Sequence, residues 1–307
     1  MVTSVAELEQ PSDSGTADAV AQDAVSAVIT VIEPKPGWRT IDFGELWKYR
    51  ELVYFLTWRD VKVRYKQTVM GAAWAILQPL MTSLVFVILF GKMGGMEVDT
   101  TVPYLLFVFA AQIAWQYFAT SVSQCGQSLV TSANLISKVY FPRLIVPLAS
   151  VGAGLVDFLV GVGVLVVLMI AYQFVPPVQI VFLPLFLVGV IVSAVGVGSL
   201  LAALTVAYRD FRYVVPFLIQ MWMFATPVGY PLNKLTNFLE SRGYSRTWEL
   251  LYFANPMAGM TQGFRWSVLG EPLDMTCLAV SAISACLLLV IGATYFRLVE
   301  RRFADIV

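Results

Sequence analysis

Histidine is absent from the 307 residues of the chain. Its absence excludes an imidazole-ligated metal site, a histidine-based catalytic triad and a histidine proton relay. Charged residues are scarce as well, at 13%, and 20 Lys and Arg residues balance 20 Asp and Glu residues. Because the formal net charge is zero, nothing points to nucleic acid as a partner, and electrostatic arguments depend on where the charges lie.

Cysteine is also rare, with only Cys125, Cys277 and Cys286. Their number is odd, their spacing matches no metal-ligand pattern, and each lies in an apolar stretch. We therefore expect three buried, small apolar side chains rather than disulfides or a metal site.

Apolar residues dominate what is present. They make up 58% of the chain, and the mean hydropathy is +0.75, a balance that a water-soluble domain of this size could not hide from solvent. A helix needs about 20 apolar residues to cross the hydrocarbon core of a bilayer. The sequence predicts an all-α integral membrane protein with six transmembrane helices, at about 70–91, 104–126, 144–172, 180–207, 214–231 and 275–296.

The first 36 residues have a different composition. They carry six acidic residues against the single cation Lys35, and they lack the basic start and apolar core of a signal peptide. We expect a disordered acidic cytoplasmic tail at 1–36, followed by one transmembrane domain at 37–307.

The Lys and Arg residues predict the orientation, because cytoplasmic loops are enriched in both. Six predicted spans place both termini on one side, together with 15 of the 20 cations. Only Lys92, Lys234, Arg242, Arg246 and Arg265 fall on the other side. The sequence therefore predicts a multi-pass membrane protein with both termini in the cytoplasm.

A basic helix is predicted at 54–66, just before the first span. Tyr54, Trp58, Val61 and Tyr65 share one helical stripe, and we expect the helix to lie in the headgroup layer. Asp60 is spaced to pair with Arg64 one turn later. The cations could simply anchor the first span to anionic lipid, or they could form a docking surface for a cytoplasmic partner; charge alone does not separate these. The residues concerned are Trp58, Arg59, Lys62, Arg64 and Lys66.

Two spans carry amides and prolines at depth, which lipid-facing helices avoid. Gln78 and Pro79 lie in the first span, and Gln220 lies between two prolines in the fifth. These two helices are expected to face protein or water. Asp157, in the third span, is the one ionisable residue predicted well inside the membrane, and no basic partner at its depth is visible in the sequence.

Aromatic residues are concentrated in three of the spans: Trp74 in the first, Trp115, Tyr117 and Phe118 in the second, and Phe217, Trp222, Phe224 and Tyr230 in the fifth. They fit a membrane-interface belt and helix packing, or else a lining on which sugar rings stack while sliding past. With the two glutamines, the candidate channel-lining residues are Trp74, Gln78, Phe217, Gln220, Trp222 and Phe224.

An external stretch at 233–273 separates the fifth and sixth spans. Its second half is apolar, but Asn255, Pro256 and two glycines interrupt it, and Arg265 would be costly at the bilayer centre. We expect two short re-entrant helices that dip back from outside.

Four long stretches resemble signature segments of one family. They are "WRDVKVRYKQTVMGAAWAILQPL", "NLISKVYFPRLIVPLA", "YRDFRYVVPFLIQMWMFATPVGYP" and "LLYFANPMAGMTQGFRW". In this order they resemble ABC-2 type permeases that export lipid-linked polysaccharides, such as O-antigen, teichoic acid and mycobacterial-type galactan. The resemblance covers residues 44 to about 300 and leaves the acidic tail unexplained.

The resemblance implies a homodimer whose channel is lined by the first and fifth spans, together with two copies of a separate ATPase that binds ATP and Mg²⁺. The absence of a G-x-x-x-x-G-K-[ST] loop from this chain agrees with a borrowed ATPase. The cargo would be a polyprenyl-diphosphate-linked polysaccharide used in cell-wall biogenesis. The ATPase-coupling segment would comprise Asn134, Leu135, Ile136, Ser137, Lys138, Val139 and Arg143. The external gate, a hairpin at 248–268, would include Trp248, Tyr252, Asn255, Pro256, Phe264, Arg265 and Trp266.

Other functions remain open at this point. A membrane-embedded transferase would need paired acids or a metal near the interface, and a secondary transporter would need ion-coupling residues at mid-depth, where only Asp157 qualifies. An ABC-2 type exporter of a small molecule, lipid or drug is the main alternative. We expect no enzymatic activity in this chain, and the sequence does not distinguish among the possible polysaccharides.

Overall fold

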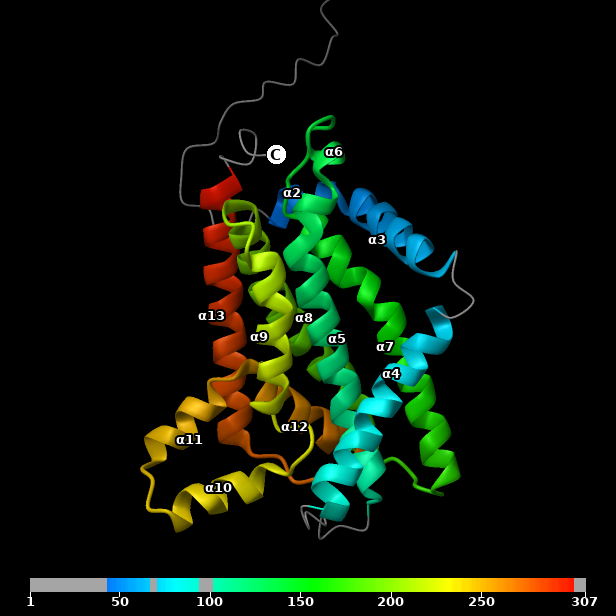
Figure 1. The fold of residues 1–307 in the computed structure, drawn as a ribbon, viewed down its shortest axis with the longest axis vertical. Coiled ribbons are helices and arrows are strands. Elements are labelled where there is room, and N and C mark those ends of the chain that lie inside the picture. The colour runs from blue at the N-terminus through cyan, green and yellow to red at the C-terminus, as the bar shows by residue number, and fades with distance from the viewer. Residues whose placement is uncertain (1–42, 67–70, 94–101, 301–307) are drawn as a thin grey trace, which may run out of the picture. The chain divides into compact units, whose positions relative to one another are not determined.

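The computed structural model describes residues 43–66, 71–93 and 102–300, and every regular element in these ranges is helical (Figure 1). This confirms the all-α prediction. The predicted tail at 1–36 lies outside the described residues, as do Lys35, Arg39, Arg301 and Arg302.

Five described segments are long and apolar enough to cross a membrane. α4 (Gly71–Phe86) continues into the π-helical segment η2 (Val87–Met93), and a 3₁₀ segment, η3 (Val178–Phe182), leads into α8. The other long helices are α5 (Tyr104–Thr131), α7 (Ile145–Ala171), α8 (Leu183–Ala207) and α13 (Met275–Glu300). α4 passes through Pro79 without ending, and its regular geometry is lost only at Val87.

The predicted fifth span at 214–231 is shorter than expected. The helix here, α9 (Phe211–Phe224), ends before Pro227, and residues 226–230 follow as a buried, non-helical segment. Pro227 has no N–H to continue the helical ladder, and the carbonyls of Pro227, Val228 and Tyr230 accept hydrogen bonds from Arg265. The described residues therefore contain five span-length helices and one shorter apolar helix, rather than six equal spans.

Short helices gather at the two ends of the long ones (Figure 1). At one end lie α2 (Phe43–Lys48), α3 (Arg50–Tyr65) and α6 (Ala133–Ile136). At the other lie α10 (Leu232–Ser241), α11 (Arg246–Phe253) and α12 (Pro256–Leu269). α11 and α12 cover the stretch at 248–268 where a re-entrant hairpin is predicted, and α12 packs against α5, α8 and α13.

α5 is the most buried of the long helices and packs against both α7 and α8. Trp115, Tyr117 and Phe118 on this helix are almost completely buried. α8 and α13 approach each other closely because both present glycine at their crossing: a methyl group on Gly292 would lie 2.1 Å from the Gly196 carbonyl oxygen.

The cysteine prediction holds for two of the three residues. Cys125 and Cys277 are buried, but Cys286 is exposed on α13. Cys286 lies on the face of α13 that no described element covers, so its apolar surroundings in the sequence did not imply burial.

Candidate functional site

α3 packs along the first half of α7. The Thr57 hydroxyl donates to the Ala149 carbonyl at 3.3 Å, and Thr57 also fills the space beside Gly152. Near the C-terminal end of α3, Arg64 forms an ion pair with Asp157 of α7. Small residues on α7 permit this close packing. The sequence predicted a helix among the lipid headgroups and did not predict its packing against α7.

The predicted stripe on α3 divides between two faces, because Val61 is buried and Tyr65 bonds to Asp157 on α7. Leu56 and Val61 are the buried residues of this helix, whereas Tyr54 is 70% exposed and Trp58 is 48% exposed. Tyr54 and Trp58 therefore lie on the outward face, where they remain available to a ligand, a lipid or a partner.

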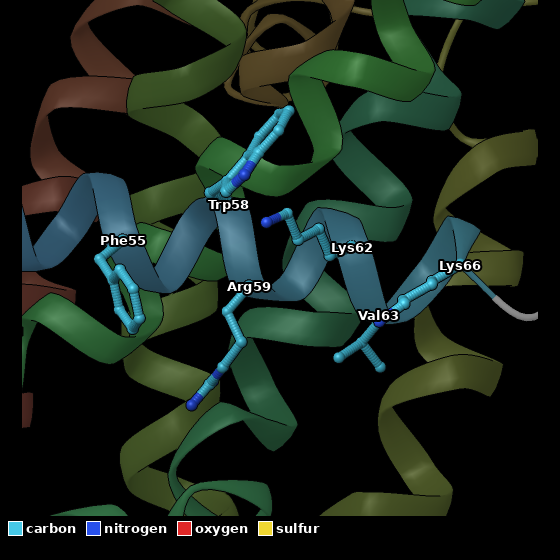
Figure 2. A pocket seen from close by; sticks show the side chains of 6 residues that line it. All are labelled: Phe55, Trp58, Arg59, Lys62, Val63 and Lys66. Atoms are coloured by element: carbon cyan, nitrogen blue, oxygen red, sulfur yellow. The ribbon is translucent and has the colours of Figure 1, made fainter.

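A shallow groove of about 370 Å³ lies on this outward face (Figure 2). We call it the α3 groove; its lining residues are Phe55, Trp58, Arg59, Lys62, Val63 and Lys66. The Lys62 amine lies 5.6 Å from the centre of the Trp58 ring, within the range of a cation–π contact. Arg59 is bonded to Asp60 at 2.8 Å, so Lys62 and Lys66 provide the remaining positive charge of the groove.

Arg64 does not belong to this groove. Its guanidinium donates to the Asp157 carboxylate and to the Gln124 side-chain oxygen, and the Tyr65 hydroxyl donates to the second Asp157 oxygen. Burial, and then the hydrogen bond to Asp157, raise the pKa of Tyr65 to about 12, so the phenol remains a donor at neutral pH. The interpretation of Asp157 as an acid without a basic partner is therefore wrong.

Most predicted channel-lining residues are exposed in the single chain. Trp74 and Gln78 on α4 are exposed, as are Phe217, Gln220 and Phe224 on α9. An amide facing hydrocarbon would lose its hydrogen bonds with water, at a cost of several kcal/mol. These faces of α4 and α9 therefore suit a watery or protein-covered environment.

Trp222 differs from that set because it is turned inward. Its indole nitrogen donates to the Asn255 side-chain oxygen at 2.9 Å, and its ring packs edge-on against Phe118 at 5.2 Å. Asn255 also accepts from the Met257 amide and so caps the start of α12. Trp222 and Asn255 thus join the end of α9 to the hairpin.

A second cavity, of about 310 Å³, lies among α3, α4, α5 and α7. Sequence reasoning missed the residues that α5 contributes to it. Gln116, Thr120 and Gln124 are spaced four residues apart and so share one face of the helix. They lie on the partly exposed side of an otherwise buried helix. This spacing is visible in the sequence and could have identified them.

The predicted ATPase-coupling segment is exposed at the end of the molecule where α3 lies (Figure 1). α6 covers Ala133–Ile136, shorter than expected, and Asn134, Ser137, Lys138 and Val139 are exposed while Leu135 and Ile136 are half-buried. Arg143 is different, because its guanidinium donates to the Glu300 carbonyl at 2.7 Å. It therefore joins this segment to the end of α13.

Arg265, the cation of the predicted gate, is buried, with 3% of its surface exposed. Its guanidinium donates to the carbonyls of Phe107, Tyr230, Pro227 and Val228, and it lies 3.7 Å from the centre of the Phe107 ring. Arg265 therefore holds α12, α5 and the segment after α9 together.

The other predicted gate residues divide between surface and core. Trp248 is exposed, and the Tyr252 hydroxyl shares a hydrogen bond with Tyr230 at 3.0 Å. Pro256 and Phe264 are buried, and Trp266 packs between Phe182 and Phe186.

Comparison with known proteins agrees with this architecture. The family profile described as "ABC-2 type transporter" matches residues 51–269. The O-antigen export system permease protein RfbA of Klebsiella pneumoniae is 26% identical over 257 residues, which cover 83% of this chain and 95% of that protein. RfbA of Myxococcus xanthus is 29% identical over 247 residues, covering 80% and 91%.

The profile match extends from α3 through α12, and so includes the α3 groove, the second cavity and the hairpin. The five span-length helices agree with a multi-pass membrane protein. The chain belongs to the ABC-2 type transporter family.

Proposed function

We propose that this chain is the membrane subunit of an ATP-driven exporter that moves polyprenyl-diphosphate-linked polysaccharide from the cytoplasm to the exterior face of the bacterial plasma membrane. Two copies form the conduit, and two copies of a separate ATPase bind ATP and Mg²⁺. The end of the molecule that carries α3 and α6 (Figure 1) faces the cytoplasm, and both termini lie in that compartment. The cargo is O-antigen, teichoic acid or galactan in type.

One observation carries the proposal: Gln78 and Gln220 are exposed on otherwise apolar helices, among exposed aromatic side chains. In a lone chain these amides would face lipid without hydrogen-bond partners. Two copies that pair through α4 and α9 would enclose them around water. Amides and aromatic faces then offer sugars weak, repeated contacts without one fixed binding position.

Energy would reach the conduit through α6 and its flanking turn. The exposed side chains of Asn134 and Lys138 suit a groove on the ATPase, and Arg143 connects the same segment to α13. A packed helix transmits a displacement as a rigid body. Closure of the ATPases around ATP would therefore shift the helices that follow α6 and open the path between the two copies.

The α3 groove would receive the pyrophosphate of the lipid carrier. Lys62 and Lys66 supply positive charge on an exposed face, and Phe55 and Trp58 supply apolar surface for the polyprenyl chain. Phosphate groups bind ammonium groups through charge-assisted hydrogen bonds.

A charge-matched comparison tests this role. Replacing Lys62 and Lys66 with Ala should lower export about tenfold, while the amount of protein inserted in the membrane changes little. Replacing Lys48 and Arg50 with Ala removes the same charge at the start of the same segment and is the control. An equal loss of insertion and export in both double variants would reduce all four cations to topology determinants.

Purification tests the assembly. The chain should co-purify with an ATPase and show no transport without nucleotide. A chain that transports alone, without an ATPase, would contradict the proposal, and drug sensitivity upon depletion without glycan accumulation would favour a small-molecule exporter.

A further inference from the structure

The cavity among α3, α4, α5 and α7, here named the α5 cavity, is distinct from the α3 groove. Its volume of about 310 Å³ lies at the small end of the range for ligand pockets, roughly 300–1,000 Å³. Polar and aromatic residues from four helices face it, including Trp74, Gln78, Gln116, Thr120, Gln124 and Asp157.

The two charges in its wall neutralise each other. Both oxygens of Asp157 are occupied, one by Arg64 and the other by Tyr65. The Arg64 guanidinium is divided between Asp157 and Gln124. The wall therefore offers no net charge to a ligand; it combines polar side chains with apolar surface from residues such as Ile113 and Phe158.

The amides provide the open hydrogen-bonding groups. Among the described residues, the side chains of Gln78 and Gln116 have no hydrogen-bond partner, and each can both donate and accept. Gln124 accepts from Arg64 and still has its NH₂ group to donate. Thr120 donates to its own helix at 2.8 Å and keeps its lone pairs for accepting. Trp74, 58% exposed, adds a flat apolar face.

We infer that the α5 cavity is a saccharide subsite, which holds a short neutral stretch of the exported glycan; this rests on the proposed function. Hydroxyl groups both donate and accept, as the amides do, and the apolar face of a sugar ring stacks on an indole. A pyrophosphate would meet a carboxylate and an arginine that is already paired. An acyl chain would leave the Gln78 and Gln116 amides and the Gln124 NH₂ group without partners.

Photocrosslinking in membranes that contain the full chain and its ATPase tests the inference. A benzophenone amino acid replaces Gln116, and in separate variants Gln127 or Gln220. Gln127 lies on the same helix outside the cavity, and Gln220 lies on the proposed conduit wall. The readout is a high-mass adduct that stains as carbohydrate after periodate oxidation, formed with the glycan that the cell itself makes. If the Gln116 variant does not accumulate, Thr120 takes its place.

We expect a carbohydrate adduct from position 116 or 120 and none from 127. An adduct from 220 without one from 116 or 120 would overturn the subsite and leave the proposed function intact. A carbohydrate adduct from 127 alone would also overturn the subsite. If no position gives an adduct and depletion of the chain causes no lipid-linked glycan to accumulate, both the subsite and the proposed function fail.

Transport supplies a second readout. Gln116→Leu should lower glycan export about fivefold, as expected for lost hydrogen bonds, while Gln127→Leu should leave export near the unmodified rate at equal membrane abundance. Equal losses in the two variants would show general wetting of α5 rather than a subsite, and would overturn the inference.

Discussion

Replacement of Arg265 with Ala should destabilise the protein strongly. The side chain is 3% exposed, and its guanidinium donates to four backbone carbonyls, with distances of 2.6 Å to Pro227 and 3.2 Å to Phe107. Those carbonyls belong to α5 and to the non-helical segment after α9. Without Arg265 they would remain buried and lose their donor, which costs about 1–3 kcal/mol for each unsatisfied group.

Since neighbouring groups relax and the losses are not additive, we expect a total decrease in the free energy of unfolding of about 3–5 kcal/mol. For a chain of this size that corresponds to a decrease in Tm of roughly 10 °C. Arg265→Lys should recover less than half of the loss, because one ammonium cannot reach both Phe107 and Pro227. Arg246→Ala removes an exposed cation from the same end and is the control.

Thermal unfolding of the purified variants, followed by tryptophan fluorescence, measures this. If Arg265→Ala left Tm within about a degree of the control but abolished export, Arg265 would act in gating rather than in holding the fold. The assignment of Arg265 as the residue that holds the segment after α9 in place would then be refuted.

Three further outcomes follow from the contacts. A double-mutant cycle of Arg64→Ala and Asp157→Asn should give a coupling of about 1–2 kcal/mol in unfolding free energy, discounted because both side chains are about a quarter exposed; additive losses would contradict the ion pair. Asn255→Ala should cost about 1–2 kcal/mol, because Met257 and Trp222 lose their acceptor. Asn255→Asp keeps that acceptor but loses the NH₂ group that donates to Ala225 and Thr226, so it should recover only part of the loss; an unchanged Tm in Asn255→Ala would contradict the capping role. Gly292→Ala should reduce the yield of folded protein severely. Gly163→Ala on α7 is the control and should be neutral or stabilising, because an added methyl group there meets nothing within 4 Å. Similar yields for the two variants would contradict the close crossing of α8 and α13.

The long helices were predictable because membrane spans are recognisable from composition alone. α7 and α13 begin within a residue of their predicted starts, at Ile145 and Met275. The path of the non-helical segment after α9 was not predictable in this way. It depends on Arg265, which lies 38 residues from Pro227 along the chain, and local composition does not register a contact at that separation.

The position of α3 was also beyond sequence reasoning. Charge and aromatic spacing indicated a basic helix, but its buried face is set by Ala149 and Gly152 on α7. Asp157 obtains its partner from a residue 93 positions away. The glutamine spacing on α5 was visible, but only packing against α7 and α8 reveals that this face alone remains open.

The most direct test of the account is depletion of the chain from its bacterial host, followed by measurement of lipid-linked glycan on the cytoplasmic side of the membrane. The account predicts that polyprenyl-diphosphate-linked polysaccharide accumulates there and disappears from the cell surface. Unchanged amounts of lipid-linked glycan on both sides would contradict it.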